Sequence, residues 1–229
     1  LFGENGAGKS TLINIVAGSF APDAGTITFR DEPLRLSSPH HARELGINAV
    51  FQEFSLVPTL SVQDNLYLGR ELTRGGLLDK GAMARGASAT LDRLGFHVDP
   101  RAQVGRFSRA EQQMVEIAKA IQSSPSVLIL DEPTASLTET EAERLFAVVE
   151  ALKASGIGII YITHRMQEIR RIADRITVLR DGRLVTTVAA GGISEQRLVE
   201  LMTGRTIEAF YPTVQSNPQR VMVEVKGLT

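Results

Sequence analysis

Short apolar segments alternate with longer segments in which apolar residues recur every three or four positions. Two of the short segments, residues 127–130 and 157–162, have the length and continuous apolar character of strands covered on both faces. Helical spacing of apolar residues follows each of them, after Thr138 and again over residues 165–173. Strands that alternate with helices predict an α/β domain built on a mainly parallel sheet.

Shorter apolar segments extend this pattern toward both ends of the chain. They predict a helix over residues 10–17 and further strands over residues 26–29, 47–51, 176–179 and 183–188. The last two strands flank Asp181-Gly182, a dipeptide typical of a tight turn between antiparallel strands. We therefore expect a small antiparallel β part beside the parallel sheet.

Residues 58–125 interrupt the alternation of strands and helices and are predicted to be helical. Two helices are expected over residues 60–68 and 80–94, the second weakened by glycines. A third begins at Ser108, which forms an S-x-x-E capping box with Glu111 and precedes a regular apolar stripe. This segment is interpreted as a helical insertion in the α/β domain.

Composition narrows the class of protein. The chain has 229 residues, 43% of them hydrophobic and 22% charged, which is typical of a globular protein. A net charge of -1 gives no overall electrostatic attraction to nucleic acid. The sequence contains no cysteine, which excludes disulfides and cysteine-bound zinc, and no apolar run approaches the roughly 18–20 residues that span a bilayer.

The two ends of the sequence suggest a piece of a longer protein. Leu1 stands just before a glycine-rich loop with no complete strand ahead of it, so we expect a first domain, residues 1–204, that lacks its true start. Residues 205–220 contain prolines and little periodicity, which predicts a linker. Residues 221–229 begin with another apolar strand and are interpreted as the start of a second domain.

A phosphate-binding motif opens the chain. The sequence from Gly3 to Ser10 matches G-x-x-x-x-G-K-[ST] and runs directly into a predicted helix. In such a loop backbone N–H groups converge on phosphate oxygens and the helix dipole attracts negative charge. Lys9 is expected to reach the β- and γ-phosphates, and the Ser10 hydroxyl to ligate Mg²⁺. The candidate nucleotide-binding residues of this segment are Gly3, Glu4, Asn5, Gly6, Ala7, Gly8, Lys9, Ser10 and Thr11; the alternative is a chance glycine-rich turn.

Acidic residues end the predicted strand over residues 127–130. Ligands of open α/β sheets bind at the carboxyl ends of strands, where Asp131 and Glu132 are expected. We predict that Asp131 holds Mg²⁺ and that Glu132 polarises the attacking water. Two acids after a strand are more often a solvated turn, and only the phosphate-binding motif makes the catalytic interpretation the stronger one.

Two further polar residues follow predicted strands. His164 follows residues 157–162 and is expected to contact the γ-phosphate, whereas Gln52 follows residues 47–51 and is expected to orient water or Mg²⁺. The remaining histidines lack such a position and are interpreted as loop or surface residues; they are His40, His41 and His97.

Taken together, these motifs resemble the ATP-binding subunits of ABC transporters. The resemblance covers residues 1–188 and consists of Walker A at residues 3–11, the Q-loop at Gln52, the signature at 107–111, Walker B at 127–132, the D-loop at 135–137 and the switch histidine His164. It implies a P-loop NTPase fold of the ABC type. Residues 111–120, 131–137 and 162–166 look most like the bacterial simple-sugar importers, in which one polypeptide carries two ABC ATPase domains.

The signature departs from the family pattern L-S-G-G-Q. Arg109 and Ala110 replace the two glycines and Glu111 replaces the glutamine. The resemblance implies that this segment, with Ser108 and Ala110, contacts nucleotide held by the other ATPase domain in a head-to-tail pair. The departure therefore concerns the partner site and leaves the site at Lys9 intact. The aromatic residue that stacks on adenine in this family would precede residue 1.

The resemblance implies an ATPase that uses ATP and Mg²⁺ to energise import of a simple sugar at the cytoplasmic face of the bacterial inner membrane. Its partners would be the second ATPase domain, the permease subunits and, indirectly, a periplasmic sugar-binding protein, with no nucleic acid. The alternatives are an importer of another solute such as a nucleoside, or a soluble ABC ATPase acting on ribosomes or DNA. Repair-type ABC proteins carry a long heptad insertion that this sequence lacks, and a GTPase would need an N-K-x-D motif, also absent.

Overall fold

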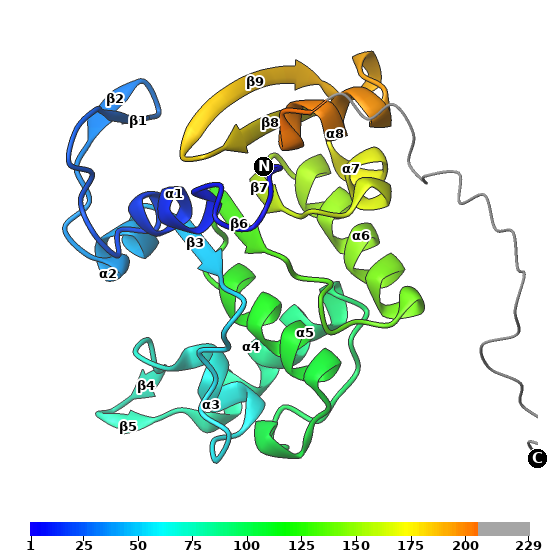
Figure 1. The fold of residues 1–229 in the computed structure, drawn as a ribbon. Helices are drawn as coiled ribbons and strands as arrows, with labels where there is room; N and C mark the ends of the chain where they lie inside the picture. Colours follow the sequence, from blue (N-terminus) through cyan, green and yellow to red (C-terminus); the bar gives the residue numbers. More distant parts are fainter. Residues whose placement is uncertain (206–229) are drawn as a thin grey trace, which may run out of the picture.

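The computed structural model describes residues 1–205, which form a parallel sheet with helices around it (Figure 1). The sheet contains β3 (Ile47–Val50), β6 (Val127–Asp131) and β7 (Gly158–Ile162) in the order β3-β6-β7. Both pairs are parallel, with Val50 opposite Leu130 and Asp131 opposite Ile162. The prediction of an α/β domain with a parallel core is confirmed.

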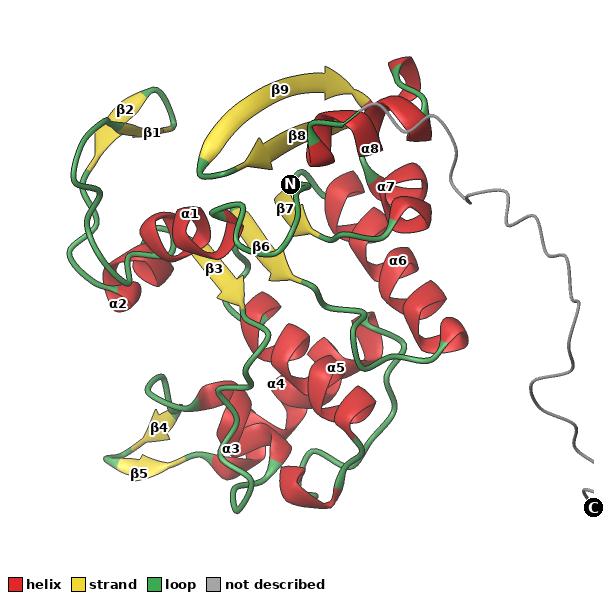
Figure 2. Cartoon of the chain, viewed as in Figure 1, coloured by secondary structure: helices red, strands yellow, loops and turns green. Residues whose placement is uncertain are grey.

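Helices surround the sheet, and short antiparallel hairpins lie outside it (Figure 2). The helices are α1 (Lys9–Val16), α2 (Pro39–Glu44), α3 (Val62–Tyr67), α4 (Lys80–Arg93), α5 (Arg109–Ile121), α6 (Glu139–Ala154), α7 (Met166–Ile172) and α8 (Glu195–Thr203). The hairpin strands are β1 (Ile27–Phe29) with β2 (Glu32–Leu34), β4 (Thr73–Arg74) with β5 (Leu77–Leu78), and β8 (Arg175–Arg180) with β9 (Arg183–Ala189). Single turns of 3₁₀ helix cover Val104–Arg106 and Ala190–Gly192.

One apolar cluster joins the helical insertion to the sheet. The helix α5 buries its predicted stripe, and the same cluster includes Leu128 and Leu130 of β6 and Leu145 of α6. Residues of α3 and α4, such as Leu66 and Leu91, pack into it from the other side. The insertion is therefore continuous with the core of the domain, and α5 lies between the two parts.

Within residues 58–125 the structure contains a hairpin that was not predicted, and it confirms the helix predicted over residues 80–94. The hairpin β4–β5 turns at Gly75 and Gly76, both at positive φ, and lies between the helices predicted over residues 60–68 and 80–94. The helix α4 runs without interruption through Gly86, and this position requires glycine because a Cβ there would collide with the Tyr67 hydroxyl. That hydroxyl in turn accepts a hydrogen bond of 2.6 Å from the Gln122 amide.

Two helices had no predicted counterpart. The short helix α2 begins with Ser38 as N-cap and Pro39 at its first position, so His40 and His41 lie in a helix and not in a loop. His40 is exposed, as predicted for a surface residue. The helix α8 begins at the Ser194 cap and ends at Gly204 in the left-handed conformation.

The predicted linker and second domain, from residue 206 onward, lie outside the described residues. Among residues 1–205, no helix is both long and apolar enough to cross a bilayer.

Candidate functional site

The glycine-rich loop before α1 adopts a conformation that depends on its glycines. Gly6 and Gly8 lie at φ values of 83° and 93°, a region that disfavours residues with a Cβ. A Cβ at Gly3 would collide with the Leu179 carbonyl, and one at Gly8 would lie 3.3 Å from the Gly182 Cα. No side chain caps α1, so its first N–H groups remain available to an anion.

The side chain of Lys9 closes this loop from inside. Its Nζ donates hydrogen bonds of 2.9 Å to the carbonyls of Gly3 and of Glu4, and the residue is buried. An ammonium group has three donors. Two therefore hold the loop in shape, and one remains for a ligand in front of it.

Three segments converge on a cavity of about 370 Å³ in front of the loop. The loop and α1 supply its floor, the end of β3 supplies Gln52, and the end of β6 supplies two carboxylates. The lining residues are Asn5, Gly6, Gly8, Lys9, Ser10, Thr11, Gln52, Asp131 and Glu132. The other predicted loop residues lie outside this lining: Gly3 and Glu4 hold Lys9, and Ala7 is buried.

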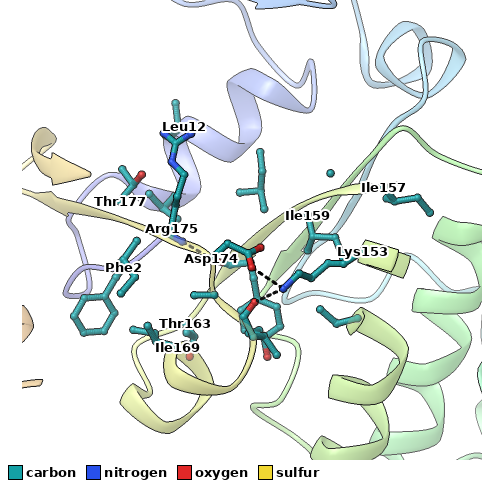
Figure 3. Close-up of a pocket in the computed structure, with 18 of the residues that line it drawn as sticks. Phe2, Leu12, Lys153, Ile157, Ile159, Thr163, Ile169, Asp174, Arg175 and Thr177 are labelled. Carbon is teal, nitrogen blue, oxygen red and sulfur yellow. Dashed lines mark hydrogen bonds and ion pairs between the residues drawn. The ribbon is translucent and has the colours of Figure 1, made fainter. Parts of the chain in front are cut away.

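A larger cavity of about 730 Å³ lies elsewhere, between β7 and β8 (Figure 3). Leu1 and Phe2 reach into this gap, where Leu1 donates to the Tyr161 carbonyl and Phe2 to the Thr177 carbonyl. Much of its lining is aliphatic, and Lys153 at its edge pairs with Asp174 at 3.2 Å. It contains none of the predicted site residues.

Asp131 is the more buried of the two carboxylates. Burial raises the pKa of its carboxyl, the neighbouring charge of Glu132 raises it further, and the Lys9 ammonium opposes both effects. A cation beside Asp131 would compensate the buried charge. Ser10 lies in the same cavity, and a hydroxyl with one carboxylate suits Mg²⁺, which keeps water and phosphate oxygens as its other ligands. These residues therefore fit the predicted magnesium site.

Glu132 and His164 are brought together from the ends of neighbouring strands. The Glu132 Oε1 lies 2.9 Å from the His164 Nδ1. Glu132 has a positive φ of 45°, and its N–H donates to the Ile162 carbonyl at 3.1 Å. This backbone contact turns the carboxylate out of the β6 direction toward both the cavity and the histidine. The imidazole is half exposed, so it remains accessible from solvent.

A buried carboxylate that sequence reasoning missed connects the same two strand ends. Glu168 of α7 accepts hydrogen bonds from Thr134 Oγ1 at 2.5 Å and from the Tyr161 hydroxyl at 3.2 Å. Burial raises the pKa of Tyr161 far above its usual value, and the charge of Glu168 raises it further, so this hydroxyl stays a donor. Thr134 follows Glu132 by two residues and Glu168 follows His164 by four, so the network ties the two loops together.

The signature segment lies apart from this cavity. Ser108 caps α5 in the predicted box: its Oγ accepts from Glu111 N at 3.3 Å, and its own N–H donates to Glu111 Oε2 at 2.7 Å. Ala110 is buried in the first turn of α5, and Arg109 is exposed. None of these residues lines the cavity at Lys9. The structure thus does not bring Ser108 or Ala110 to the chain's own phosphate loop.

A family model described as "ABC transporter" matches residues 1–135, more than half of the chain. The chain belongs to the ABC transporter family. Among its curated relatives, the ribose import ATP-binding protein RbsA 1 of Rubrobacter xylanophilus is 49% identical over 228 residues. The galactose/methyl galactoside import ATP-binding protein MglA of Escherichia coli is 43% identical over 229 residues. Both alignments cover 100% of this chain but 46% and 45% of the relatives, so the chain spans just under half their length.

Solved structures of the same family share the fold. The ADP conformation of MJ1267, an ATP-binding cassette of an ABC transporter, matches with a TM-score of 0.74 and 25% identity, over 89% of this chain and 86% of that one. A dimeric post-hydrolysis structure of the cassette MJ0796, bound to ADP and Pi, has a TM-score of 0.71 at 23% identity, over 84% of each chain. The latter shows the fold alone.

Proposed function

We propose that this chain binds ATP with Mg²⁺ in the cavity at Lys9 and hydrolyses it there, as one ATPase domain of a longer importer protein. The observation that carries the proposal is the convergence of four residues on one cavity: Lys9, Ser10, Asp131 and Glu132. Glu132 is in addition hydrogen-bonded to His164. The loop of residues 3–11 would hold the phosphates through its N–H groups and the free Lys9 donor.

Each polar residue of the cavity has a role in this proposal. Ser10 and Asp131, with Gln52 beside them, would hold Mg²⁺, which neutralises charge that develops on the phosphates. The Glu132 carboxylate would accept a hydrogen bond from the attacking water and orient it. His164 would contact the γ-phosphate from the β7 side, where its hydrogen bond to Glu132 fixes its ring.

We further propose that the whole protein imports a simple sugar. The relatives support this, because their names specify import of ribose or of galactose and methyl galactoside. Import places the protein at the cytoplasmic face of the bacterial inner membrane, attached to permease subunits and served indirectly by a periplasmic sugar-binding protein. A second ATPase domain in the same polypeptide would complete a head-to-tail pair, which agrees with the length of the relatives.

Reconstitution tests this function directly. The full-length protein and its permease are placed in proteoliposomes, with the sugar-binding protein on the face opposite the ATPase. Uptake of ribose, galactose and a nucleoside is then compared with MgATP inside or outside. We expect sugar uptake only when MgATP is on the side of the ATPase. Nucleoside uptake without sugar uptake would contradict the sugar assignment, and association with ribosomes in place of a permease would contradict import altogether.

A further inference from the structure

The loop that follows Gln52 is fastened to α5 at Ser55. The buried carboxylate of Glu116 accepts hydrogen bonds from the Ser55 N–H and, at 3.2 Å, from its hydroxyl. The Lys119 Nζ donates to the Ser55 carbonyl at 3.3 Å and to its Oγ at 2.9 Å. Both backbone groups of Ser55 are therefore held by side chains of one helix.

The next fixed point of the same loop is Val57. Its N–H donates to Asn65 Oδ1 at 2.8 Å, and its carbonyl accepts from Asn65 Nδ2 at 3.0 Å. Asn65 is fully buried in α3. Residues 55–57 thus have fixed positions, and only residues 53 and 54 separate them from Gln52, which lines the cavity.

Arg109 adds a contact to this shorter part. Its guanidinium carbon lies 5.0 Å from the centroid of the Phe54 ring, within the range of a cation–π interaction. Arg109 and Glu116 are two turns apart on α5, and Lys119 follows one turn later, so all three side chains meet the loop from one face. A glycine at position 109 could not make this contact.

We propose that Arg109 is a positioning residue for Gln52: by stacking on Phe54, it fastens the loop of residues 52–55 to the first turn of α5. Gln52 is two residues from Phe54, which limits their Cα separation to about 7 Å. A shift of the α5 N-terminus therefore carries Gln52 with it. Ser108 and Ala110 lie in the same turn. If they contact nucleotide at the partner site, as the proposed function on which this inference rests requires, binding of that nucleotide moves Gln52 at the Lys9 site.

The test compares variants of the full-length protein. Arg109→Gln and Phe54→Leu each remove one half of the contact, and Arg109→Lys retains a cation that can lie over the ring. Arg106→Gln is the control, because Arg106 is exposed just before the signature on a separate 3₁₀ turn. The measurements are amide hydrogen exchange of residues 52–57 without nucleotide, and the kcat and KM of ATP hydrolysis.

We expect Arg109→Gln and Phe54→Leu each to speed exchange of residues 52–57 about two- to fivefold, the loss of one exposed cation–π contact. The double variant should show no more than either single change, and Arg109→Lys should recover part of the protection. In hydrolysis, kcat should fall with KM for ATP unchanged, because Gln52 is displaced while the phosphate loop is intact.

Two results would overturn the inference. Additive effects of the two single changes would show that Arg109 and Phe54 act independently, and an Arg109→Gln protein with the same exchange and kcat as Arg106→Gln would show that the contact positions nothing. The exchange experiment needs no nucleotide. A wild-type protein that does not hydrolyse ATP would thus contradict the proposed function without deciding this inference, which the exchange result decides separately.

Discussion

The cavity at Lys9 and the first turn of α5 are the two places where this chain is expected to meet nucleotide, and they differ in completeness. The cavity combines the phosphate loop with carboxylates at the end of β6, and His164 after β7 contacts one of these carboxylates. The turn of α5 presents Ser108 at an exposed helix start, with an arginine where the family has glycine.

This difference indicates how much of each site belongs to the chain. The cavity at Lys9 has its own cation, carboxylates and anion-binding backbone, so this chain supplies most of the contacts of the proposed ATP site. The α5 turn has only a cap and a neighbouring loop, so it can complete a site but not form one. The two sites of the whole protein are therefore expected to be unequal.

The largest effect should follow from loss of the proposed catalytic carboxylate. Glu132→Gln keeps the size of the side chain and removes its negative charge, so we expect ATP to bind while turnover at this site falls about 10²- to 10⁴-fold. Hydrolysis is measured in the full-length protein with the other site disabled. Glu32→Gln, an exposed change on β2, serves as the control, and wild-type turnover in the Glu132 variant would reject its catalytic role.

Next in size is the loss of the phosphate-loop cation. Lys9→Ala removes a charge-assisted contact worth roughly 1.5–3 kcal/mol, so ATP affinity at this site should weaken about 10- to 150-fold. Calorimetric titration of the full-length protein should then show one fewer tightly bound ATP per chain. Lys80→Ala, on the exposed start of α4, should bind like wild type. Unchanged ATP affinity in the Lys9 variant would show that ATP does not bind in this cavity.

A smaller effect is expected from the network behind the cavity. Thr134→Val keeps the side-chain shape but removes the donor to buried Glu168, which should lower the free energy of unfolding by about 1–3 kcal/mol. The loops that carry Glu132 and His164 would also lose a hydrogen bond that connects them. Their side chains would then be held less firmly, so kcat for ATP hydrolysis should fall. Thr140→Val, exposed on α6, is the matched control in denaturant unfolding of the full-length protein. Equal unfolding of the two variants would show that the network contributes little.

The smallest effect concerns the signature. Restoring both glycines with Arg109→Gly and Ala110→Gly should change nucleotide affinity at the partner site, while affinity at Lys9 stays within about twofold, because neither residue lines that cavity. Site-resolved binding, with each phosphate loop disabled in turn, separates the two. A change in affinity confined to nucleotide held by Lys9 would contradict the head-to-tail arrangement.

Much of the fold and of the two candidate nucleotide-contacting regions could be predicted from the sequence, since the motifs that form them are local. The apolar segment before Asp131 predicted β6, and the S-x-x-E pattern predicted the capping of α5 at Ser108. The position of His164 after β7 was enough to expect it at the phosphate site, because parallel strands end at the same edge.

Other features depend on contacts between distant segments and have no local pattern. Glu168 looks like an ordinary charged residue of an amphipathic helix, and only the fold shows that it is buried against Thr134. The stacking of Arg109 on Phe54 joins residues far apart in sequence. The hairpin β4–β5 was missed because its strands are only two residues long, too short for any periodicity to appear.

The cavity at Lys9 and the first turn of α5 are proposed to contact two different nucleotides. Amide hydrogen exchange of the full-length protein tests this proposal with and without MgATP, in wild type and in Lys9→Ala. Wild type should show ATP-dependent protection of both residues 3–11 and residues 108–112. In Lys9→Ala the protection of residues 3–11 should disappear while that of residues 108–112 remains, because the partner's nucleotide still reaches α5. Loss of both protections together would contradict the account, since a single nucleotide would then contact both regions.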